Sequence, residues 1–462
     1  MQTRKTLAIL AVAALAVAGL TACGNGDDNG GGAETVDPTP DPNPDVAVDP
    51  DPDPDSDGSE GFTGDPVTLT WSGWDLARGT EFQDLTEAFN AQHDNITIEL
   101  VDYPNAEWIV AMTADLAAGT APDLITLRNI TDAVTWGGAG QLHDVSDIVA
   151  GLDPDTAMRD VYVIGDGTWG VPFRADHWVL YYNIDMFEAA GVDLPDGTWT
   201  WDDYHDAAVA LRDSGTLDTG VSPAYQHNWP STVSAFAHVQ TLPRVDLWSG
   251  DMNWLAPYYE RALARDAERL QPNFGAVTTG SLHHLAEFGQ QRVAMTYMGT
   301  WFMAQLIDPE QNVDDFRWGL APVPQFDNST TGLNNVPTTV GGPTGVGINV
   351  NLSGDELAAA RVFLTWVVGP EGAMVLANRG QTAPLMTDAA MTALTSAPGM
   401  PNDELALFAL GTRTVGLENL PDERSSILTQ IFGDFHTEVM SGSTSIERGV
   451  ENAERRFVEE LG

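Results

Sequence analysis

Val-Thr-Leu-Thr-Trp at 67–71 opens the stretch that decides the fold, which continues through Ile-Thr-Ile-Glu-Leu-Val at 96–101 to Asp-Leu-Ile-Thr-Leu at 123–127. Each of these segments is short, rich in β-branched and aliphatic residues, and typical of a strand. Between them, apolar residues recur at helical spacing at 82–89 and again at 112–117. The strand–helix–strand–helix–strand order predicts a parallel α/β sheet.

The residues that follow the first and third predicted strands are the first candidates for a binding site. They are Trp74, Asp75, Arg128, Asn129 and Trp136. Ligands of open α/β sheets bind beyond the carboxyl ends of the strands, which is where these side chains are expected.

The α/β pattern continues along the chain. Further strands are expected at 178–183, 293–297 and 345–350. Two helix starts carry capping-box patterns, one from Thr200 to Asp203 and one from Ser353 to Glu356. From about Asp403 onward the pattern is mainly helical.

The N-terminus predicts export. Arg4 and Lys5 precede an uncharged apolar run at 7–20, which is shorter than the roughly 20 residues of a membrane span but right for a signal peptide. Residues 20–23, Leu-Thr-Ala-Cys, resemble a bacterial lipobox, so 1–22 are expected to be removed and Cys23 to carry a lipid. The alternative is an ordinary signal peptide followed by an accidental cysteine. Because Cys23 is the single cysteine, no disulfide can form within one chain.

Residues 23–64 are expected to form a disordered acidic tether. They are rich in Gly, Asp and Pro and contain no Lys or Arg. Such a composition cannot bury enough apolar surface to offset the entropy of ordering, so the segment is interpreted as a spacer. A calcium-binding acidic repeat is the less favoured alternative, because the Asp-Pro spacing lacks the glycine turns of calcium loops.

The folded part is strongly acidic. The chain has a formal charge of −47, and residues 65–462, with 18 basic and 55 acidic groups, account for −37. This charge disfavours nucleic acid and anionic lipid as partners. It fits either a saline habitat, where counterions screen the repulsion, or compositional drift in a GC-rich genome.

Six blocks of sequence resemble one family, the extracellular solute-binding proteins of family 1, which includes maltodextrin-binding and glycerol-phosphate-binding proteins. The blocks occur in the family's order along residues 65–462. They lie at 117–123, 169–172, 180–183, 288–295, 299–301 and 319–324.

The resemblance implies a two-lobed periplasmic-binding-protein fold of type II, the Venus-flytrap arrangement, with chain crossovers between the lobes and a mainly helical C-terminal part. Hinge closure would trap a ligand between the lobes. Lobe 1 is expected to comprise 65–173 and 323–385, and lobe 2 to comprise 174–322 and 386–462.

The resemblance also implies a function. The chain is expected to be a monomeric, lipid-anchored protein on the extracellular face of the cell membrane that binds a sugar or oligosaccharide and delivers it to the permease of an ABC importer. One alternative is a binding protein for a glycerol-phosphate-type solute, kept open by Arg128 and Arg174. The other is a lipid-anchored glycoside hydrolase.

By the same resemblance, ligand contacts are expected from Trp74, Asp75, Asp176, Trp229, Trp301 and Gly342, and the sheet-edge argument adds Asn129. Aromatic faces suit the CH faces of sugars, and carboxylates and amides suit their hydroxyls. For each tryptophan the alternative is a core position, and Asp176 could instead be a surface carboxylate.

Catalytic motifs are absent from the sequence. It contains no His-Glu-x-x-His, no Gly-x-Ser-x-Gly and no phosphate-binding loop. The pair His283-His284 lacks partners at metal-ligand spacing and is expected to be an exposed helix feature. No cofactor, metal or catalytic residue is therefore predicted.

Overall fold

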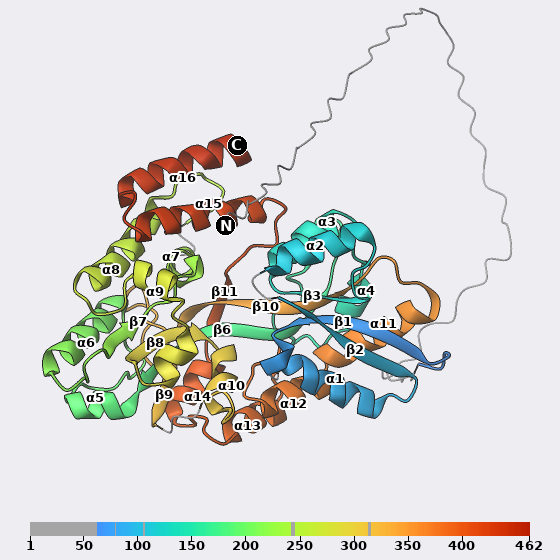
Figure 1. Ribbon diagram of the computed structural model, residues 1–462, viewed down its shortest axis with the longest axis horizontal. Coiled ribbons are helices and arrows are strands. Elements are labelled where there is room, and N and C mark those ends of the chain that lie inside the picture. The colour runs from blue at the N-terminus through green and yellow to red at the C-terminus, as the bar shows by residue number, and fades with distance from the viewer. Residues whose placement is uncertain (1–61, 79, 105–106, 242–244, 313–315) are drawn as a thin grey trace, which may run out of the picture. The chain divides into compact units, whose positions relative to one another are not determined.

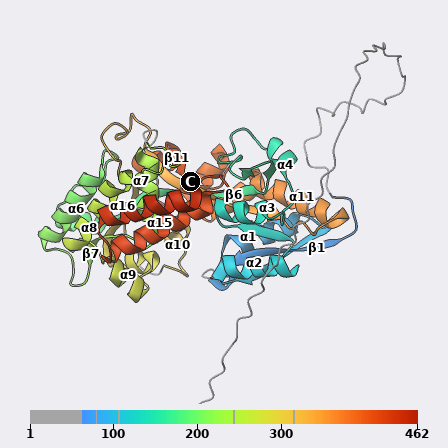
Figure 2. The same ribbon diagram turned by 90° about the horizontal axis from the view of Figure 1, so that it is seen from above.

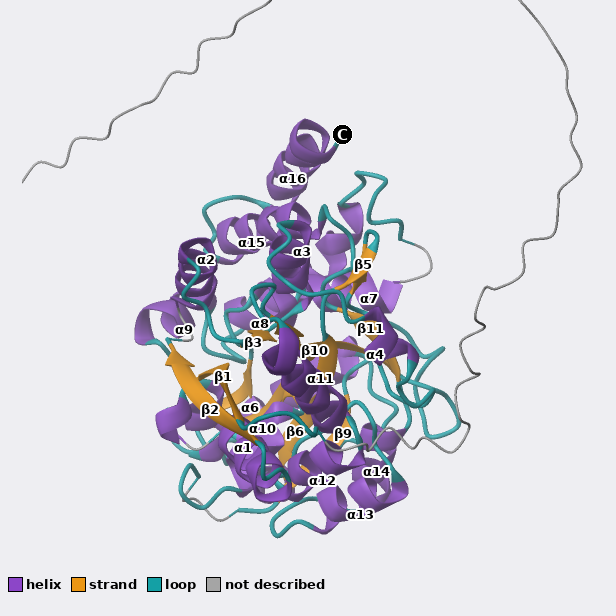
Figure 3. Cartoon of the chain, turned by 90° about the vertical axis from the view of Figure 1, so that its right-hand side faces the viewer, coloured by secondary structure: helices purple, strands orange, loops and turns teal. Residues whose placement is uncertain are grey.

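The computed structural model describes residues 62–78, 80–104, 107–241, 245–312 and 316–462. The predicted signal peptide, Cys23 and nearly all of the predicted tether lie outside these residues. Within them, strands form the interior and helices surround them (Figure 3).

The first three strands form the parallel unit that the sequence predicts. β1 (Val67–Trp74) pairs in parallel with β2 (Ile96–Tyr103) on one side and β3 (Leu124–Leu127) on the other. The connecting helices are α1 (Glu81–Gln92) and α2 (Trp108–Ala118). Asp123 fixes the turn into β3, because its carboxylate accepts hydrogen bonds from the backbone N and Oγ1 of Thr70 at 2.8 and 2.7 Å.

Two long strands run through both halves of the molecule (Figure 1). β6 (Val171–Asn183) pairs along its first half with β10 (Thr338–Ile348) and along its second half with β8 (Val293–Gly299) and β9 (Trp318–Pro322). The strand order is β2-β1-β3-β10-β6-β8-β7, where β7 is Ser222–Tyr225.

The sheet is mixed, so the prediction of a parallel sheet is correct only for its two ends. β10 lies antiparallel to both β3 and β6, and β6 lies antiparallel to β8, whereas β7 and β8 are parallel. β3 and β10 are more than 200 residues apart in the chain. A local strand–helix–strand pattern carries no information about the direction of such a distant neighbour.

Helices cover the sheet on both sides. In the half that contains β1 they include α3 (Ile130–Gly138), α4 (Ser146–Ala150), α11 (Gly354–Val368) and α12 (Pro370–Asn378). In the other half they include α5 (Ile184–Ala190), α6 (Trp201–Ser214), α7 (Ser234–Thr241), α8 (Ala256–Ala267), α9 (Phe274–Gly280) and α10 (Trp301–Ile307). The two-residue strands β4 (Val163–Ile164) and β5 (Gly167–Thr168) form a separate hairpin, and α13 (Asp388–Ser396) follows α12.

The two predicted capping boxes have different outcomes. At α6 the box is confirmed: the Thr200 backbone N and Oγ1 donate to the Asp203 carboxylate at 2.8 and 2.6 Å, and the backbone N of Asp203 donates back to Thr200 Oγ1. At α11, Ser353 does occupy the N-cap, but its side chain makes no capping hydrogen bond. That part of the prediction is wrong.

The C-terminal part is mainly helical, as predicted, with one strand that the sequence did not indicate. α14 (Glu404–Gly411) is followed by β11 (Thr414–Leu417), which pairs in parallel with β10. α15 (Ser425–Met440) then packs against α16 (Ile446–Leu461), α8 and α3 (Figure 2). The predicted lobe boundaries stay a prediction.

Among the described helices, none alone is long and apolar enough to cross a membrane. α11 and α12 meet that requirement only as a pair bent by 55°. In the fold, α11 packs against β1 and β6, and α12 packs against α1.

Candidate functional site

A cavity of about 570 Å³ lies where β6 and β10 pass between the two halves of the sheet. All seven residues that the sequence proposes as ligand contacts line it. They are Trp74, Asp75, Asn129, Asp176, Trp229, Trp301 and Gly342. Segments that lie far apart in the chain thus converge here, although their role in ligand binding stays a prediction.

One wall of the cavity is aromatic. The Trp301 ring, at the first turn of α10, lies edge-on to Trp178 of β6, with ring centroids 5.7 Å apart, and 6.4 Å from the tilted ring of Trp229. Gly299 is required for this placement, because a Cβ there would lie 1.7 Å from the Trp301 ring. Trp301 and Trp229 are both half-buried, so each keeps part of its ring surface open.

Trp74 contributes a second aromatic surface from the end of β1. Its ring is held edge-on by Phe82 at 5.0 Å and by Trp108 at 5.4 Å between centroids, and it is half-buried. The next residue, Asp75, has a φ of 53°, a left-handed conformation that is uncommon for residues other than glycine. This turn directs the chain away from the sheet at the cavity edge.

Trp136, the other tryptophan suggested by the sheet-edge argument, does not line the cavity. It is 2% exposed, and its Nε1 donates to Thr113 Oγ1 at 3.1 Å. Trp136 lies on the face of α3 that packs into the core, so that expectation is wrong.

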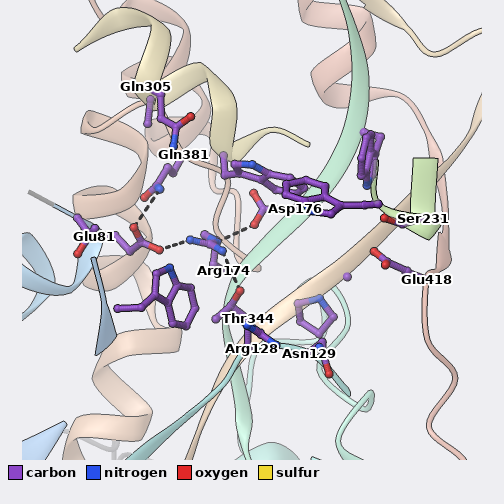
Figure 4. Close-up of a pocket in the computed structure, with 18 of the residues that line it drawn as sticks. Glu81, Arg128, Asn129, Arg174, Asp176, Ser231, Gln305, Thr344, Gln381 and Glu418 are labelled. Atoms are coloured by element: carbon purple, nitrogen blue, oxygen red, sulfur yellow. Dashed lines mark hydrogen bonds and ion pairs between the residues drawn. The ribbon is translucent and has the colours of Figure 1, made fainter. Parts of the chain in front are cut away.

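A buried charge network forms the end of the cavity next to α1 (Figure 4). Arg174 of β6 pairs with Asp176 at 2.6 Å and also with Glu81, while its Nη2 donates to Thr344 Oγ1 at 3.0 Å. Thr300 donates to the second oxygen of Asp176 at 3.0 Å. Asp176 is 3% exposed, so it is not a surface carboxylate.

The network holds Arg174 in its charged form. Burial alone would lower the pKa of Arg174, but Asp176 and Glu81 outweigh that effect and raise it. Burial raises the pKa of Asp176, although the neighbouring guanidinium and the Thr300 hydroxyl oppose the rise. Both carboxylates are thus engaged with one cation inside the protein.

Asn129 lines the cavity and also caps a helix. It is the N-cap of α3, and its Oδ1 accepts from the backbone N of Asp132 at 3.3 Å. Asp132 is fully buried and accepts from the Arg128 backbone N at 2.9 Å and from Trp108 Nε1 at 3.2 Å. Burial raises the pKa of Asp132 to about 6.

Gly342 faces Asp176 across the β6–β10 pairing. A Cβ built at Gly342 would meet no atom within 4 Å. Since Gly342 also lines the cavity, a side chain at this position would project into the open space.

Several lining residues were missed by sequence reasoning. They include Glu81, Ser231, Gln305, Gln381 and Glu418. Glu418 follows the strand β11 that the sequence did not reveal, and Glu81 sits within an ordinary amphipathic helix pattern. No motif distinguishes either residue from the many other carboxylates of the chain.

The pair His283-His284 differs in part from the exposed helix feature that the sequence predicts. Both residues line the cavity, and His284 is 3% exposed with its Nε2 3.1 Å from Gln305 Oε1. Burial lowers the pKa of His284 well below its usual value, so the imidazole is neutral at pH 7. The expectation of an exposed pair is therefore wrong for His284, whereas His283 is exposed and also lines the cavity.

A second hollow, of about 630 Å³, lies on the outside of the half that contains β7. Its lining comes from α5, from residues 216–221 and from residues 290–292, and it contains no tryptophan, tyrosine or phenylalanine. None of the seven predicted contacts reaches it. The cavity at β6 and β10 is therefore the better candidate for a binding site.

Comparisons with known proteins agree with this geometry. The model of the bacterial extracellular solute-binding protein family matches residues 73–374. The galactooligosaccharide-binding protein of Bacillus subtilis (strain 168) is 30% identical over 132 residues, which are 28% of this chain and 30% of that protein. The sn-glycerol-3-phosphate-binding periplasmic protein of Agrobacterium fabrum is 27% identical over 167 residues, 34% of this chain and 38% of that protein. The chain thus aligns with only about a third of the length of the curated relatives it matches.

A solved structure matches over a much longer span. The crystal structure of a sugar transporter from Rhizobium etli, in an open conformation, superimposes with a TM-score of 0.69 at 27% identity and covers 86% of this chain and 100% of that one. The two-lobed α/β fold predicted from the sequence is confirmed by this likeness.

Proposed function

The chain belongs to the family of bacterial extracellular solute-binding proteins, and on this premise we propose that it captures a sugar or oligosaccharide in the cavity at β6 and β10 for an ABC importer. The observation that carries the proposal is the combination of partly exposed indoles and hydrogen-bonding groups in one cavity. Trp74, Trp229 and Trp301 supply the faces, and Asn129, Gln305 and Glu418 supply polar groups.

This combination matches the chemistry of a saccharide. A pyranose ring presents apolar CH groups on its faces and hydroxyl groups around its rim, so stacking and hydrogen bonding act at the same time. Micromolar affinity requires about 8 kcal/mol. Two stacked rings and a few charge-assisted hydrogen bonds of roughly 1.5–3 kcal/mol each are sufficient after the costs of binding.

A glycerol-phosphate-type solute is the second candidate, favoured by the similarity to the Agrobacterium protein and by three arginines on the cavity wall. The internal pairing of these arginines argues against it. Arg174 is engaged by Glu81 and Asp176, and Arg379 pairs with Asp84. Arg128 lies close enough to Asp132 to lower the pKa of that carboxyl against the effect of burial. A phosphate would have to compete with these carboxylates.

A thermal-shift screen of the purified protein against neutral saccharides and glycerol 3-phosphate tests the proposal. Ligand at 100 times its dissociation constant adds about 2.7 kcal/mol to the free energy of unfolding, which is readily measured. Gly342→Leu is the matched control, because a Cβ at this position meets no atom within 4 Å and the longer side chain would occupy part of the cavity. We expect a neutral saccharide to stabilise the wild type and not Gly342→Leu. Stabilisation by glycerol 3-phosphate alone would replace the sugar proposal with the second candidate.

Binding without turnover is part of the proposal. Chromatography of the same mixtures after prolonged incubation should recover the saccharide intact. Hydrolysis products that disappear in Gly342→Leu would instead support the glycoside hydrolase alternative.

We further propose that the protein is a monomer anchored through a lipid on Cys23 to the extracellular face of the cell membrane, where it delivers its ligand to the permease subunits. The lipobox-like sequence at 20–23 and the Gly/Asp/Pro-rich residues 23–64 support an anchor and a spacer. The charge of −37 on residues 65–462 supports adaptation to a saline habitat.

A further inference from the structure

Glu418 lies at the opposite end of the cavity from Glu81 and Gln381 (Figure 4). It follows β11 directly, and its backbone N donates to the carbonyl oxygen of Gly341 at 2.9 Å, which extends the pairing with β10. Ser231, in the short 3-10 helix Pro230–Thr232, lies close enough to the Glu418 carboxyl to lower its pKa against the larger effect of burial. The backbone hydrogen bond to Gly341 thus fixes the main chain of Glu418 at the cavity wall.

The two ends of the cavity differ in how their carboxylates are satisfied. Glu81 and Asp176 share Arg174, so one positive charge inside the protein offsets part of their negative charge. Among the residues that the structure describes, no Arg, Lys or His pairs with Glu418. A carboxylate offers about four acceptor positions, and Ser231 is the one neighbour named as lowering the pKa of this group.

The surroundings of Glu418 favour a ligand that donates hydrogen bonds to its carboxylate. Burial raises the pKa of Glu418 to about 7, so the carboxyl is ionised in about half of the molecules at pH 7, although the residue is exposed on the cavity wall. In such a setting a bound ligand displaces the water that solvates the carboxylate. Unless the ligand donates hydrogen bonds in return, the charge is left desolvated, which is unfavourable.

We propose that Glu418 is a specificity-determining residue that selects saccharides presenting hydrogen-bond donors at this end of the cavity and rejects those presenting a carboxylate or phosphate there. The donors are either a pair of neighbouring hydroxyls or the ammonium group of an amino sugar. This inference rests on the proposed function of the same cavity.

The position of Glu418 beside Trp229 favours contact with a substituent of a stacked sugar ring. Ser231 immediately follows Trp229-Pro230, so Glu418 stands beside the aromatic wall. A ring stacked on Trp229 would bring its rim substituents toward that carboxylate. A negative substituent at the same place would meet a like charge that no ion pair among the described residues compensates.

The test compares Glu418→Gln with wild type by calorimetric titration. The probes are the glucose, galactose and mannose series, each as the neutral sugar, the 2-amino sugar and the uronic acid, as mono- and disaccharides. Glu423→Gln is the control, because it removes a carboxylate from the same loop without touching the cavity wall. The melting temperature of each ligand-free variant shows whether it is folded.

We expect Glu418→Gln to lower the affinity for the best-binding neutral or amino sugar at least tenfold. The ratio between this affinity and the affinity for the corresponding uronic acid should become smaller. Glu423→Gln should change neither quantity. A larger loss for amino sugars would identify an ammonium group as the partner, and a larger loss for neutral sugars would identify hydroxyls.

Two results would overturn the inference in distinguishable ways. If a sugar binds the wild type and Glu418→Gln keeps both the affinity and the preference over the uronic acid, Glu418 does not set specificity, and the proposed function stands. If no member of any series binds the wild type, the proposed function itself fails. Should Glu418→Gln not fold, Glu418→Asp is measured in its place; because it shortens the side chain and keeps its charge, affinity for the best-binding sugar should fall while the preference over the uronic acid remains.

Discussion

Replacing Trp301 with alanine separates a ligand-stacking role from a core role. The indole is half-buried, with Trp178 against one edge and Trp229 6.4 Å away, so part of its surface packs on protein and part faces the cavity. Stacking one sugar ring there would bury ~50 Å² of apolar surface, or ~1–1.5 kcal/mol, before any effect of the cavity left behind. We therefore expect Trp301→Ala to weaken saccharide binding about tenfold or more.

The ligand-free protein should stay folded. A fully buried tryptophan costs about 3–5 kcal/mol when truncated to alanine, and the half-buried Trp301 should cost less. Trp254 provides a matched control, because it is also half-buried and packs on Phe432 with ring centroids 5.7 Å apart, but it does not line the cavity.

Calorimetric titration gives the affinity and a denaturant titration gives the free energy of unfolding. We expect Trp254→Ala to lose stability without loss of affinity, and Trp301→Ala to lose affinity disproportionately. If Trp301→Ala binds the saccharide as tightly as wild type, or fails to fold without ligand, the indole is a packing residue and the stacking argument is refuted.

Three further predictions concern charge and anchoring. Burial raises the pKa of Asp132 from 3.8 to about 6, so the folded protein binds this proton more tightly than the unfolded chain does. The resulting stabilisation is complete below pH 3.8, the pKa in the unfolded chain, and is lost as the pH rises through 6. Asp132→Asn stays neutral, so the free energy of unfolding of wild type relative to this variant should fall by roughly 2.5 kcal/mol between pH 4 and pH 7, measured by denaturant titration at each pH. A difference that does not vary with pH would contradict the argument. The charge of −37 on residues 65–462 should make the melting temperature rise from 0.01 M salt, where the screening length is about 30 Å, to molar chloride; a flat or falling curve would leave compositional drift as the explanation of the acidity. Cys23→Ser should release the protein from the membrane fraction of its host, and unchanged retention on fractionation would argue against the lipid anchor.

The sequence was most informative where structure depends on near neighbours. The strands β1 to β3 and the capping box at Thr200 follow from local periodicity and local hydrogen bonds. The residues after strands were also well placed, because in this fold the strand ends meet at one cavity.

Features that depend on distant segments were not accessible in this way. The direction of β10 against β3, and the existence of β11, depend on pairing between residues that are far apart in the chain. The burial of His284 depends on Phe302 and Gln305 of α10, which its own neighbours do not reveal. Glu418 is one of 55 acidic residues in the folded part, and only its position opposite Glu81 distinguishes it.

The most direct test of the account is a crystal structure of the protein grown with the saccharide that stabilises it most in the thermal-shift screen. The account predicts density for a sugar ring in the cavity at β6 and β10, with one face against Trp301 or Trp229 and a rim substituent within hydrogen-bonding distance of Glu418. Density for the saccharide in the outer hollow beside α5, with the cavity at β6 and β10 empty, would contradict it.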